Sequence, residues 1–174
     1  MRLFFALWPD SVLRERIAGV AAALRLDATA LHVPRENYHV TLAFIGEVAS
    51  SELAALRQLG RSRRAWASEI RFDALEYWKG AQAIVAVARQ TPQAVSELAK
   101  ELVRSSSVEP ALRLHVTLAR KVAQAPVPQA MSPIEWDARS FSLVRSDTSR
   151  AHSVYTVVDT WPLLDKTQKS WQSP

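Results

Sequence analysis

Two copies of the pentapeptide His-Val-Thr-Leu-Ala begin at His39 and His115, in opposite halves of the chain. Each copy places a threonine, Thr41 or Thr117, two residues after the histidine. Imidazole titrates near pH 6.5, so one histidine of a pair can be protonated while the other is neutral, as acid and base roles in one displacement require. Threonine hydroxyls donate hydrogen bonds to phosphate oxygens. These residue types therefore favour proton transfer at a phosphate group.

Each copy is predicted to form a β-strand, because side chains alternate between the two faces of a strand. The residues expected to face the core in the first copy are Tyr38, Val40, Leu42 and Phe44. Those expected in the second copy are Leu114, Val116 and Leu118. The opposite face of each strand carries the histidine and the threonine. If the two strands lie in adjacent lobes, these polar faces meet across a cleft and surround one small anion.

Other interpretations of the histidines are weaker. A single His-x-Thr strand is typical of a structural histidine near a sheet edge, and it is the duplication that favours a site. Neither motif contains an aspartate, glutamate or cysteine, so two histidines would leave a metal incompletely coordinated. The chain has no cysteine, which excludes disulfides, thiolate nucleophiles and iron–sulfur clusters. We therefore expect no metal and no cofactor.

The segments between the motifs predict a mixture of helices and antiparallel strands. Helical periodicity follows the Pro9-Asp10-Ser11 turn, follows Ser50-Ser51-Glu52 up to about Trp66, and follows Thr91-Pro92, where Thr91 is expected to cap. The strands expected besides the two motifs are 3–8, 70–78, 83–88, 134–144 and 153–161. A loop is expected over 123–133. This order indicates an α+β fold.

Composition sets limits on the class of protein. With 174 residues and 48% hydrophobic content, we expect one domain over residues 1–174, with a mobile tail from about residue 165. Lys and Arg outnumber Asp and Glu by 22 to 17, which is compatible with an anionic partner such as a nucleic acid or with solubility alone. The apolar N-terminal run ends at Trp8-Pro9, too early for a signal peptide or membrane span, so we expect a cytoplasmic protein.

Over nearly its whole length the chain resembles the two-histidine phosphoesterase superfamily, and specifically the bacterial RNA 2′,3′-cyclic phosphodiesterases, also called 2′-5′ RNA ligases. Besides the paired motifs, the segments that resemble this family are 2–7, 33–38, 39–47, 143–146 and 161–163, with Arg120 and Tyr155. One departure is Leu114, which stands where the family often has proline.

The resemblance implies a bilobal fold in which two pseudo-symmetric lobes each present a motif strand to a central cleft. It also implies hydrolysis of a 2′,3′-cyclic phosphate to a 2′-phosphate, with 2′-5′ ligation as a reverse-type activity. His39 would be the general acid that protonates the leaving 3′ oxygen, and His115 the base that activates water. Thr41 and Thr117 would hold the phosphate. The implied partner is an RNA with a 2′,3′-cyclic phosphate end or a related nucleotide, with no membrane and no obligate protein partner.

Several residues and functions remain open at this level. Arg120 is expected on the strand face opposite His115, so a phosphate contact would need a bend. Tyr155 is interpreted either as a base-stacking or as a packing residue. His32 and His152 are interpreted as surface histidines, and the six tryptophans as core or lobe-contact residues. The alternative functions are a non-catalytic RNA-end binding module and a related 2′-5′ or small cyclic-nucleotide phosphodiesterase.

Overall fold

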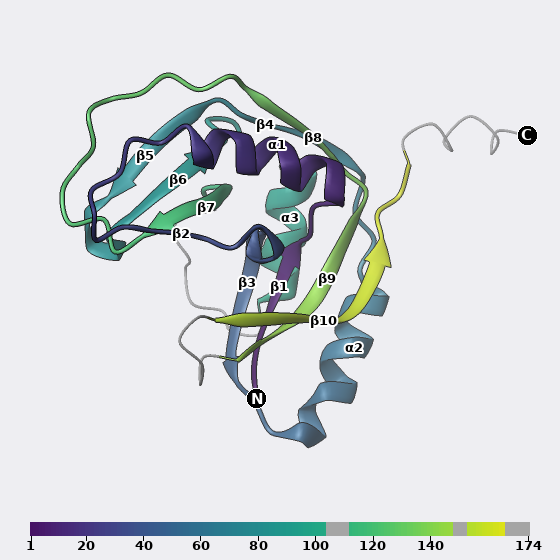
Figure 1. Ribbon diagram of the computed structural model, residues 1–174. Helices are drawn as coiled ribbons and strands as arrows, with labels where there is room; N and C mark the ends of the chain where they lie inside the picture. Colours follow the sequence, from purple (N-terminus) through teal and green to yellow (C-terminus); the bar gives the residue numbers. More distant parts are fainter. Residues whose placement is uncertain (104–111, 148–152, 166–174) are drawn as a thin grey trace, which may run out of the picture.

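The computed structural model describes residues 1–103, 112–147 and 153–165, and all strand pairs within these ranges are antiparallel (Figure 1). The first sheet has the order β10-β9-β1-β3 and is built from β1 (Arg2–Leu7), β3 (Val40–Glu47), β9 (Ser140–Asp147) and β10 (Val154–Pro162). The second has the order β2-β7-β6-β5 and is built from β2 (Leu31–His32), β5 (Ala74–Trp78), β6 (Ala83–Val87) and β7 (His115–Arg120). The expected bilobal α+β fold is confirmed.

A two-stranded ribbon of β4 (Ser68–Phe72) and β8 (Ile134–Ala138) connects the two sheets. The expected strands 70–78 and 134–144 are therefore wrong as single strands, because each is interrupted and continues in another sheet. The first break is at Asp73, whose N–H donates to the Val87 carbonyl of the second sheet. The second is at Arg139, whose carbonyl accepts from Leu163 N–H after β10. Each ribbon strand is thus followed by a strand of a different sheet, β4 by β5 of the second sheet and β8 by β9 of the first.

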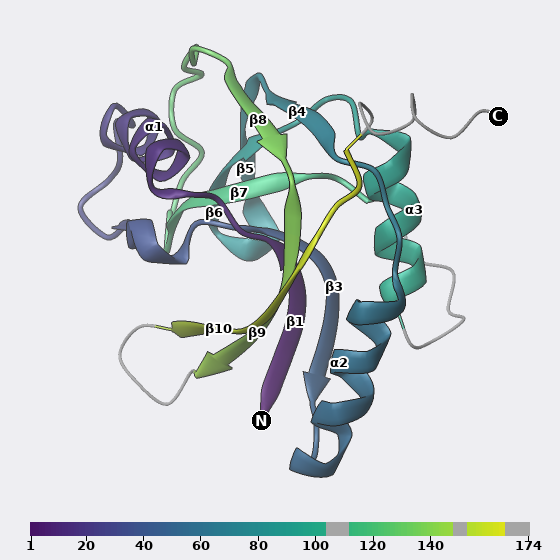
Figure 2. The ribbon, with the colours of Figure 1, turned by 90° about the vertical axis from the view of Figure 1, so that its right-hand side faces the viewer.

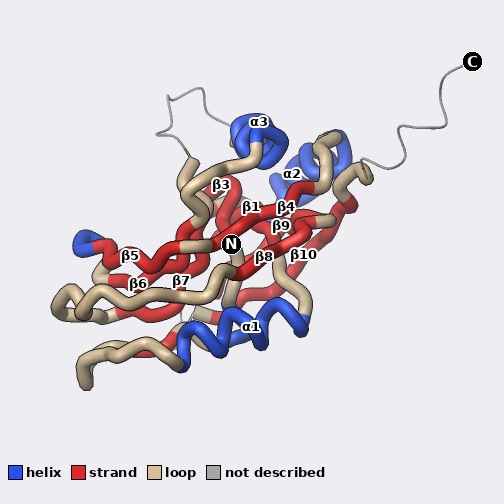
Figure 3. Tube along the Cα trace, turned by 90° about the horizontal axis from the view of Figure 1, so that it is seen from above, coloured by secondary structure: helices blue, strands red, loops and turns tan. Residues whose placement is uncertain are grey.

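Helix α1 (Ser11–Ala22) begins where the Asp10 carboxylate accepts a hydrogen bond from the Leu13 N–H at 2.8 Å. It buries Leu13, Ile17 and Ala21 and contacts β7 and β8. Figures 2 and 3 show α1 on one side of the strands, and α2 (Leu53–Ser62) and α3 (Gln93–Leu102) on the opposite side. Helices thus cover both sides of the strands and leave the cleft between the sheets to the motif residues.

Two helix boundaries differ from the sequence prediction. Helix α2 ends at Ser62 instead of Trp66, and the Arg63 N–H bonds the Gly60 carbonyl. Gly60 lies so close to Trp161 that an added Cβ would meet indole atoms at 2.5 Å, so this helix fits its sheet only with glycine there. Thr91 does not cap α3, because its hydroxyl donates instead to the Leu112 carbonyl. That bond connects the start of α3 to the segment that leads into β7.

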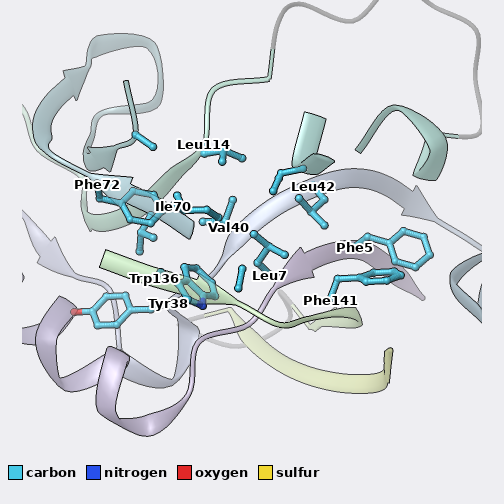
Figure 4. Packing of buried hydrophobic residues seen from close by; sticks show 14 of the residues in the cluster. Phe5, Leu7, Tyr38, Val40, Leu42, Ile70, Phe72, Leu114, Trp136 and Phe141 are labelled. Atoms are coloured by element: carbon cyan, nitrogen blue, oxygen red, sulfur yellow. The ribbon is translucent and has the colours of Figure 1, made fainter. Parts of the chain in front are cut away.

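One hydrophobic cluster contains residues of both sheets and of all three helices. Figure 4 shows Val40 and Leu42 of β3 in this cluster with Leu114, the residue before β7. Leu114 is fully buried, and its carbonyl accepts from the Ala88 N–H at 3.0 Å, so this position is held firmly without the family's proline. The motif strands are therefore anchored from the core side.

The remaining expectations concern loops and termini. The segment 123–133 contains no helix or strand, as expected for a loop. Residues 166–174, almost all of the expected tail, and His152 lie outside the described residues. In the part of the chain that the structure describes, no helix combines the length and apolar character needed to cross a membrane.

Candidate active site

The two motif strands come from different sheets and contact each other. β3 is the outer strand of the first sheet, whereas β7 lies between β2 and β6 in the second. His39 immediately precedes β3, and His115 is the first residue of β7. The His115 ring is near enough to His39 to disfavour its protonation. The structure therefore brings the two distant motifs together.

Both imidazoles are fixed by the same local hydrogen bond. Nδ1 of His39 lies 2.7 Å from the Asn37 carbonyl oxygen, and Nδ1 of His115 lies 2.9 Å from the Arg113 carbonyl oxygen. A carbonyl oxygen can only accept, so Nδ1–H donates in both rings. In each neutral ring Nε2 then carries the lone pair, and it is the atom able to take up or deliver a proton.

His39 lies among aromatic side chains. Its ring centroid is 5.0 Å from Phe4, 5.7 Å from Trp8 and 5.1 Å from Tyr155. The pKa of His39 is lowered from 6.5 to about 4, mainly by burial; the Asn37 carbonyl opposes this shift, and the positive charges of His115 and Arg120 contribute to it. His39 is therefore neutral at pH 7.

His115 has one aromatic neighbour and a charged support. Its ring is 4.3 Å from that of Trp78, and the Trp78 indole N–H donates to Glu76 at 2.9 Å. Glu76 also accepts from the Arg113 guanidinium at 2.6 Å, so one carboxylate orients both neighbours of the histidine. Burial lowers the pKa of His115, the Arg113 carbonyl opposes this, and the charges of Arg120 and Arg113 lower it further.

The motif threonines occupy equivalent places on their strands. Thr41 pairs with Ala6 of β1, and Thr117 pairs with Val85 of β6. Ala6 and Val85 belong to two small apolar clusters, one on each sheet, that are separate from the main core. Both threonines are half-buried. They therefore stand beside their histidines on the sheet face that is turned away from the core, as the alternation predicts.

An extra residue in each motif strand reverses the alternation after the threonine. In β3, Thr41 pairs with Ala6 but Ala43 pairs with the next residue, Phe5, so Leu42 is unpaired. In β7 the same irregularity follows Thr117, which pairs with Val85 while Ala119 pairs with Ile84. Such β-bulges shift all later side chains to the other face.

Two sequence predictions are corrected by these bulges. Arg120 was expected to face away from His115, but it pairs with Ala83 of the second sheet's outer apolar cluster and lines the same hollows as His39. Phe44, at the equivalent position of the first motif, was expected in the core. Its side chain is 57% exposed, and it lines one of these hollows. The two motifs therefore each extend three residues beyond the threonine on the cleft face.

Two hollows meet at His39, Arg120, Ser153 and Tyr155, which line both of them. One is a cavity of about 190 Å³ that adds Thr117, Lys121 and the residues around β2. The other, of about 390 Å³, adds Thr41, Phe44, Phe4, Arg2 and Ser146. Side chains of both motifs thus surround connected spaces whose polar groups suit an anion.

Five further side chains differ from their sequence interpretation, refine it or were missed. Tyr155 contacts His39 and Phe4 edge-on, so it packs against the site. Trp8 and Trp78 flank the two histidines instead of serving the core, which the sequence did not indicate because it depends on strand pairing. His32 is exposed, as expected, but it also lines the smaller cavity. Asn37 was missed as well, and its buried amide donates to the Ser153 carbonyl at 2.7 Å.

The described residues contain no group of three or more His, Asp or Glu side chains placed to hold a metal ion. What they offer is two imidazoles with available Nε2 atoms, two hydroxyls and a guanidinium. These groups can bind a phosphate and move protons at it.

Comparison with known proteins agrees with this geometry. A family model described as the 2′-5′ RNA ligase superfamily matches residues 9–150, which include both motifs. The chain belongs to this superfamily. Two curated relatives of this 2′-5′ RNA ligase superfamily member are both named RNA 2′,3′-cyclic phosphodiesterase. The protein from Thermus thermophilus is 29% identical, over 94% of this chain and 90% of the relative. The one from Escherichia coli is 28% identical, over 93% and 96%.

Solved structures of the superfamily have the same fold. E. coli LigT complexed with 3′-AMP superposes with a TM-score of 0.83 at 27% identity, covering 93% of this chain and 97% of LigT. The T. thermophilus protein TT0787 superposes with a TM-score of 0.77 at 26% identity, covering 95% and 100%. The two-lobed arrangement of this superfamily member is therefore shared over nearly the whole chain.

Proposed function

We propose that this protein is an RNA 2′,3′-cyclic phosphodiesterase that hydrolyses a 2′,3′-cyclic phosphate end to a 2′-phosphate, without a metal or cofactor. The observation that carries the proposal is the pair of identical motifs on contacting strands, with each imidazole held through Nδ1 and its Nε2 left for proton transfer. The proposal takes residues 1–174 as one two-lobed domain, since one hydrophobic cluster contains residues of both sheets.

In the proposed reaction water attacks phosphorus opposite to O3′. His115 Nε2 takes a proton from the water as the new P–O bond forms. His39 Nε2 delivers a proton to O3′ as the P–O3′ bond breaks, which leaves a 2′-phosphate and a 3′-hydroxyl. Exchange with solvent then returns both rings to their starting protonation states. Thr41 and Thr117 donate hydrogen bonds to the non-bridging oxygens, and Arg120 balances their negative charge.

The lowered pKa values imply that the substrate itself promotes protonation of His39, the proposed general acid. Both imidazoles have a lowered pKa before a substrate binds, mainly because they are buried and partly because the positive charge of Arg120 acts on them. A bound cyclic phosphate places a negative charge among these groups and offsets Arg120, so it raises the pKa of both histidines. His39 therefore acquires its proton together with the substrate.

Phe44 supplies a place for the terminal base in this proposal. Its exposed ring lines the larger hollow beside His39 and Thr41, and the Arg2 guanidinium lies 4.8 Å from its ring centroid. Exposed aromatic faces bind unpaired bases by stacking, without reading the sequence. Phe44 thus takes the stacking role considered for Tyr155, whose ring packs against His39 and Phe4.

The test is product analysis with an RNA oligonucleotide that carries a 2′,3′-cyclic phosphate end. The expected product is a 2′-phosphate, formed at an unchanged rate in excess EDTA. His39→Ala and His115→Ala are each expected to lower kcat at least about a hundredfold, the usual minimum contribution of a general acid or base. Circular dichroism and thermal unfolding check that both variants are folded.

Three outcomes contradict the proposal. Full activity in either histidine variant contradicts the proposed acid-base mechanism. Binding of the oligonucleotide without turnover identifies an RNA-end binding module instead. Loss of activity in EDTA, restored by a divalent cation, shows that the chemistry depends on a metal. The same product analysis detects a 2′-5′ linkage if an RNA with a free 5′-hydroxyl is added.

A further inference from the structure

The two hollows lie on one side of the proposed reaction. Both are lined by His39 and Arg120, and His115 is among the lining residues of neither. In the proposed function His39 protonates the leaving oxygen and His115 activates water on the opposite side of phosphorus. The space for RNA beyond the terminal nucleoside therefore lies beside His39 and Arg120, which line both hollows.

The smaller cavity is built by β2 and the end of β7. β2 pairs with β7 through Leu31–Arg120 and His32–Ala119, and the Val33 N–H continues the pairing by donating to the Leu118 carbonyl at 2.9 Å. The walls combine the apolar side chains of Val33 and Pro34 with the polar side chains of His32 and Lys121. This mixture suits a nucleotide, which has apolar ring faces and a charged phosphate.

Lys121 enters the cavity wall through an unusual backbone conformation. Its φ is +57°, in the left-handed region that lysine rarely adopts. The next residue fixes this conformation, since the Val122 N–H donates to the Gln82 carbonyl at 3.0 Å, while the Thr29 hydroxyl, which donates to the Asp27 carboxylate, lies 3.2 Å from the Lys121 carbonyl. Backbone conformations of this kind are kept where the surrounding structure enforces them, often at binding sites.

We propose that this cavity binds the nucleotide that precedes the cyclic phosphate end, with the phosphate that joins the two nucleotides on Lys121. The inference rests on the proposed function and specifies its substrate class as RNA of at least two nucleotides. An ammonium group is a strong binder of phosphate without base specificity. The ion pairs among the described residues involve other cations than Lys121, so its charge is available to a ligand.

The test compares adenosine 2′,3′-cyclic phosphate with a diadenosine that ends in the same cyclic phosphate. The two probes differ by one nucleotide and one phosphodiester. We expect kcat/KM to be about tenfold higher for the dinucleotide, as for one charge-assisted phosphate contact. Lys121→Gln is expected to remove most of that preference, and Lys121→Arg to retain it. With wild type, the KM for the dinucleotide should depend more steeply on salt, by about 0.7 in the logarithmic slope.

Two further variants serve as controls. Lys100→Gln removes the same charge on the exposed side of α3 and is expected to leave both kcat/KM values unchanged. Lys121→Gly removes the side chain where glycine adopts the backbone conformation without strain, so it separates loss of charge from misfolding. It should behave as Lys121→Gln does.

The outcomes separate this inference from the proposed function. Equal kcat/KM for the two probes, or an equal loss on both in Lys121→Gln, overturns the second nucleotide site and leaves the phosphodiesterase in place. No turnover of either probe by the wild-type protein overturns the proposed function, and the inference with it.

Discussion

The two copies of the His-Val-Thr-Leu-Ala motif are identical in sequence and share a bulge after the threonine and an Nδ1 bond to a backbone carbonyl, yet they place their histidines in different surroundings. His39 contacts three aromatic rings and has a neutral amide behind it, Asn37, which bonds the Ser153 carbonyl. His115 contacts one ring and is supported by the charged pair of Glu76 and Arg113. The motif thus supplies the reactive atoms, and the lobe around it sets their proton affinity.

The bulges of the two motif strands are likewise equivalent in position, but the residues that they turn to the cleft differ. Each strand has an extra residue at the leucine after the threonine, so the residue two positions later turns to the cleft in both lobes; β3 has a second irregularity at Ile45, beyond Phe44. In one lobe that residue is Phe44, and in the other it is Arg120. Equivalent positions thus present an apolar ring and a positive charge. A nucleotide, with a base at one end and a phosphate at the other, is asymmetric in the same way.

The largest expected effect is that of replacing each histidine with alanine, and it shows whether the two histidines have different roles. In a cyclic substrate with sulfur in place of O3′, the leaving thiolate needs no protonation because thiols are far more acidic than alcohols. His39→Ala should slow the oxygen substrate about a thousandfold but the sulfur substrate by less than about tenfold. His115→Ala should slow both substrates alike, since the base still acts on water. Single-turnover rates with the two substrates provide the measurement.

Wild type with both substrates is the reference for this experiment, and Thr41→Ser, which keeps a hydroxyl, is the matched control for the site. Recovery of His115→Ala on the sulfur substrate, in place of His39→Ala, would exchange the acid and base roles. The low pKa of His39 makes this a demanding test, because the proposed acid is the histidine with the more enclosed ring.

A smaller effect concerns acid stability. The pKa of His39 is lowered from 6.5 to about 4 in the folded protein. Below pH 6.5 the unfolded chain therefore binds a proton that the folded protein does not, and stability falls as the pH decreases toward 4. The loss attributable to His39 is about 2 to 3 kcal/mol at pH 4.5. Urea unfolding at pH 7 and pH 4.5 should show this difference in wild type and a reduced one in His39→Gln.

The matched variant for acid stability is His115→Gln, which should reduce the pH dependence less, because fewer rings enclose His115. Titration of the imidazole Cε1–H signals by NMR assigns the effect to each ring, and added inorganic phosphate should raise both pKa values. A His39 signal that titrates near its ordinary pH in the free protein would contradict the difference between the lobes.

The sequence was sufficient for the motif strands as far as the threonines. His39, Thr41, His115 and Thr117 share the cleft faces because alternation is a local property of a strand. The sequence prediction failed three residues later, at Phe44 and Arg120, because the unpaired residue of each bulge is a leucine, which does not mark a bulge in a sequence. A bulge is defined by pairing with another strand, which the motif sequence does not contain.

The prediction of single strands over 70–78 and 134–144 was wrong for a related reason. Apolar and aromatic residues lie on both sides of Asp73 and of Arg139, so each segment resembles one long strand. The breaks exist because the two halves pair with different partners, β8 and β6 in the first case, and β4 and β1 in the second. The pairing of Trp8 and Trp78 with the histidines likewise follows from tertiary contacts between distant segments.

The smallest expected effect concerns the supports behind the histidines. Glu76→Gln keeps the shape of the side chain but loses the charge that holds Arg113 and Trp78, so kcat should fall about threefold, with stability changed by less than about 1 kcal/mol because the pair is partly exposed.

Asn37→Ala removes a buried hydrogen bond and should cost about 1 to 3 kcal/mol of stability as well as activity. The His115 and Trp78 NMR signals should shift only in the first variant, and those of His39 only in the second. Shifts of both histidines in either variant would mean that the lobes do not set the two environments separately.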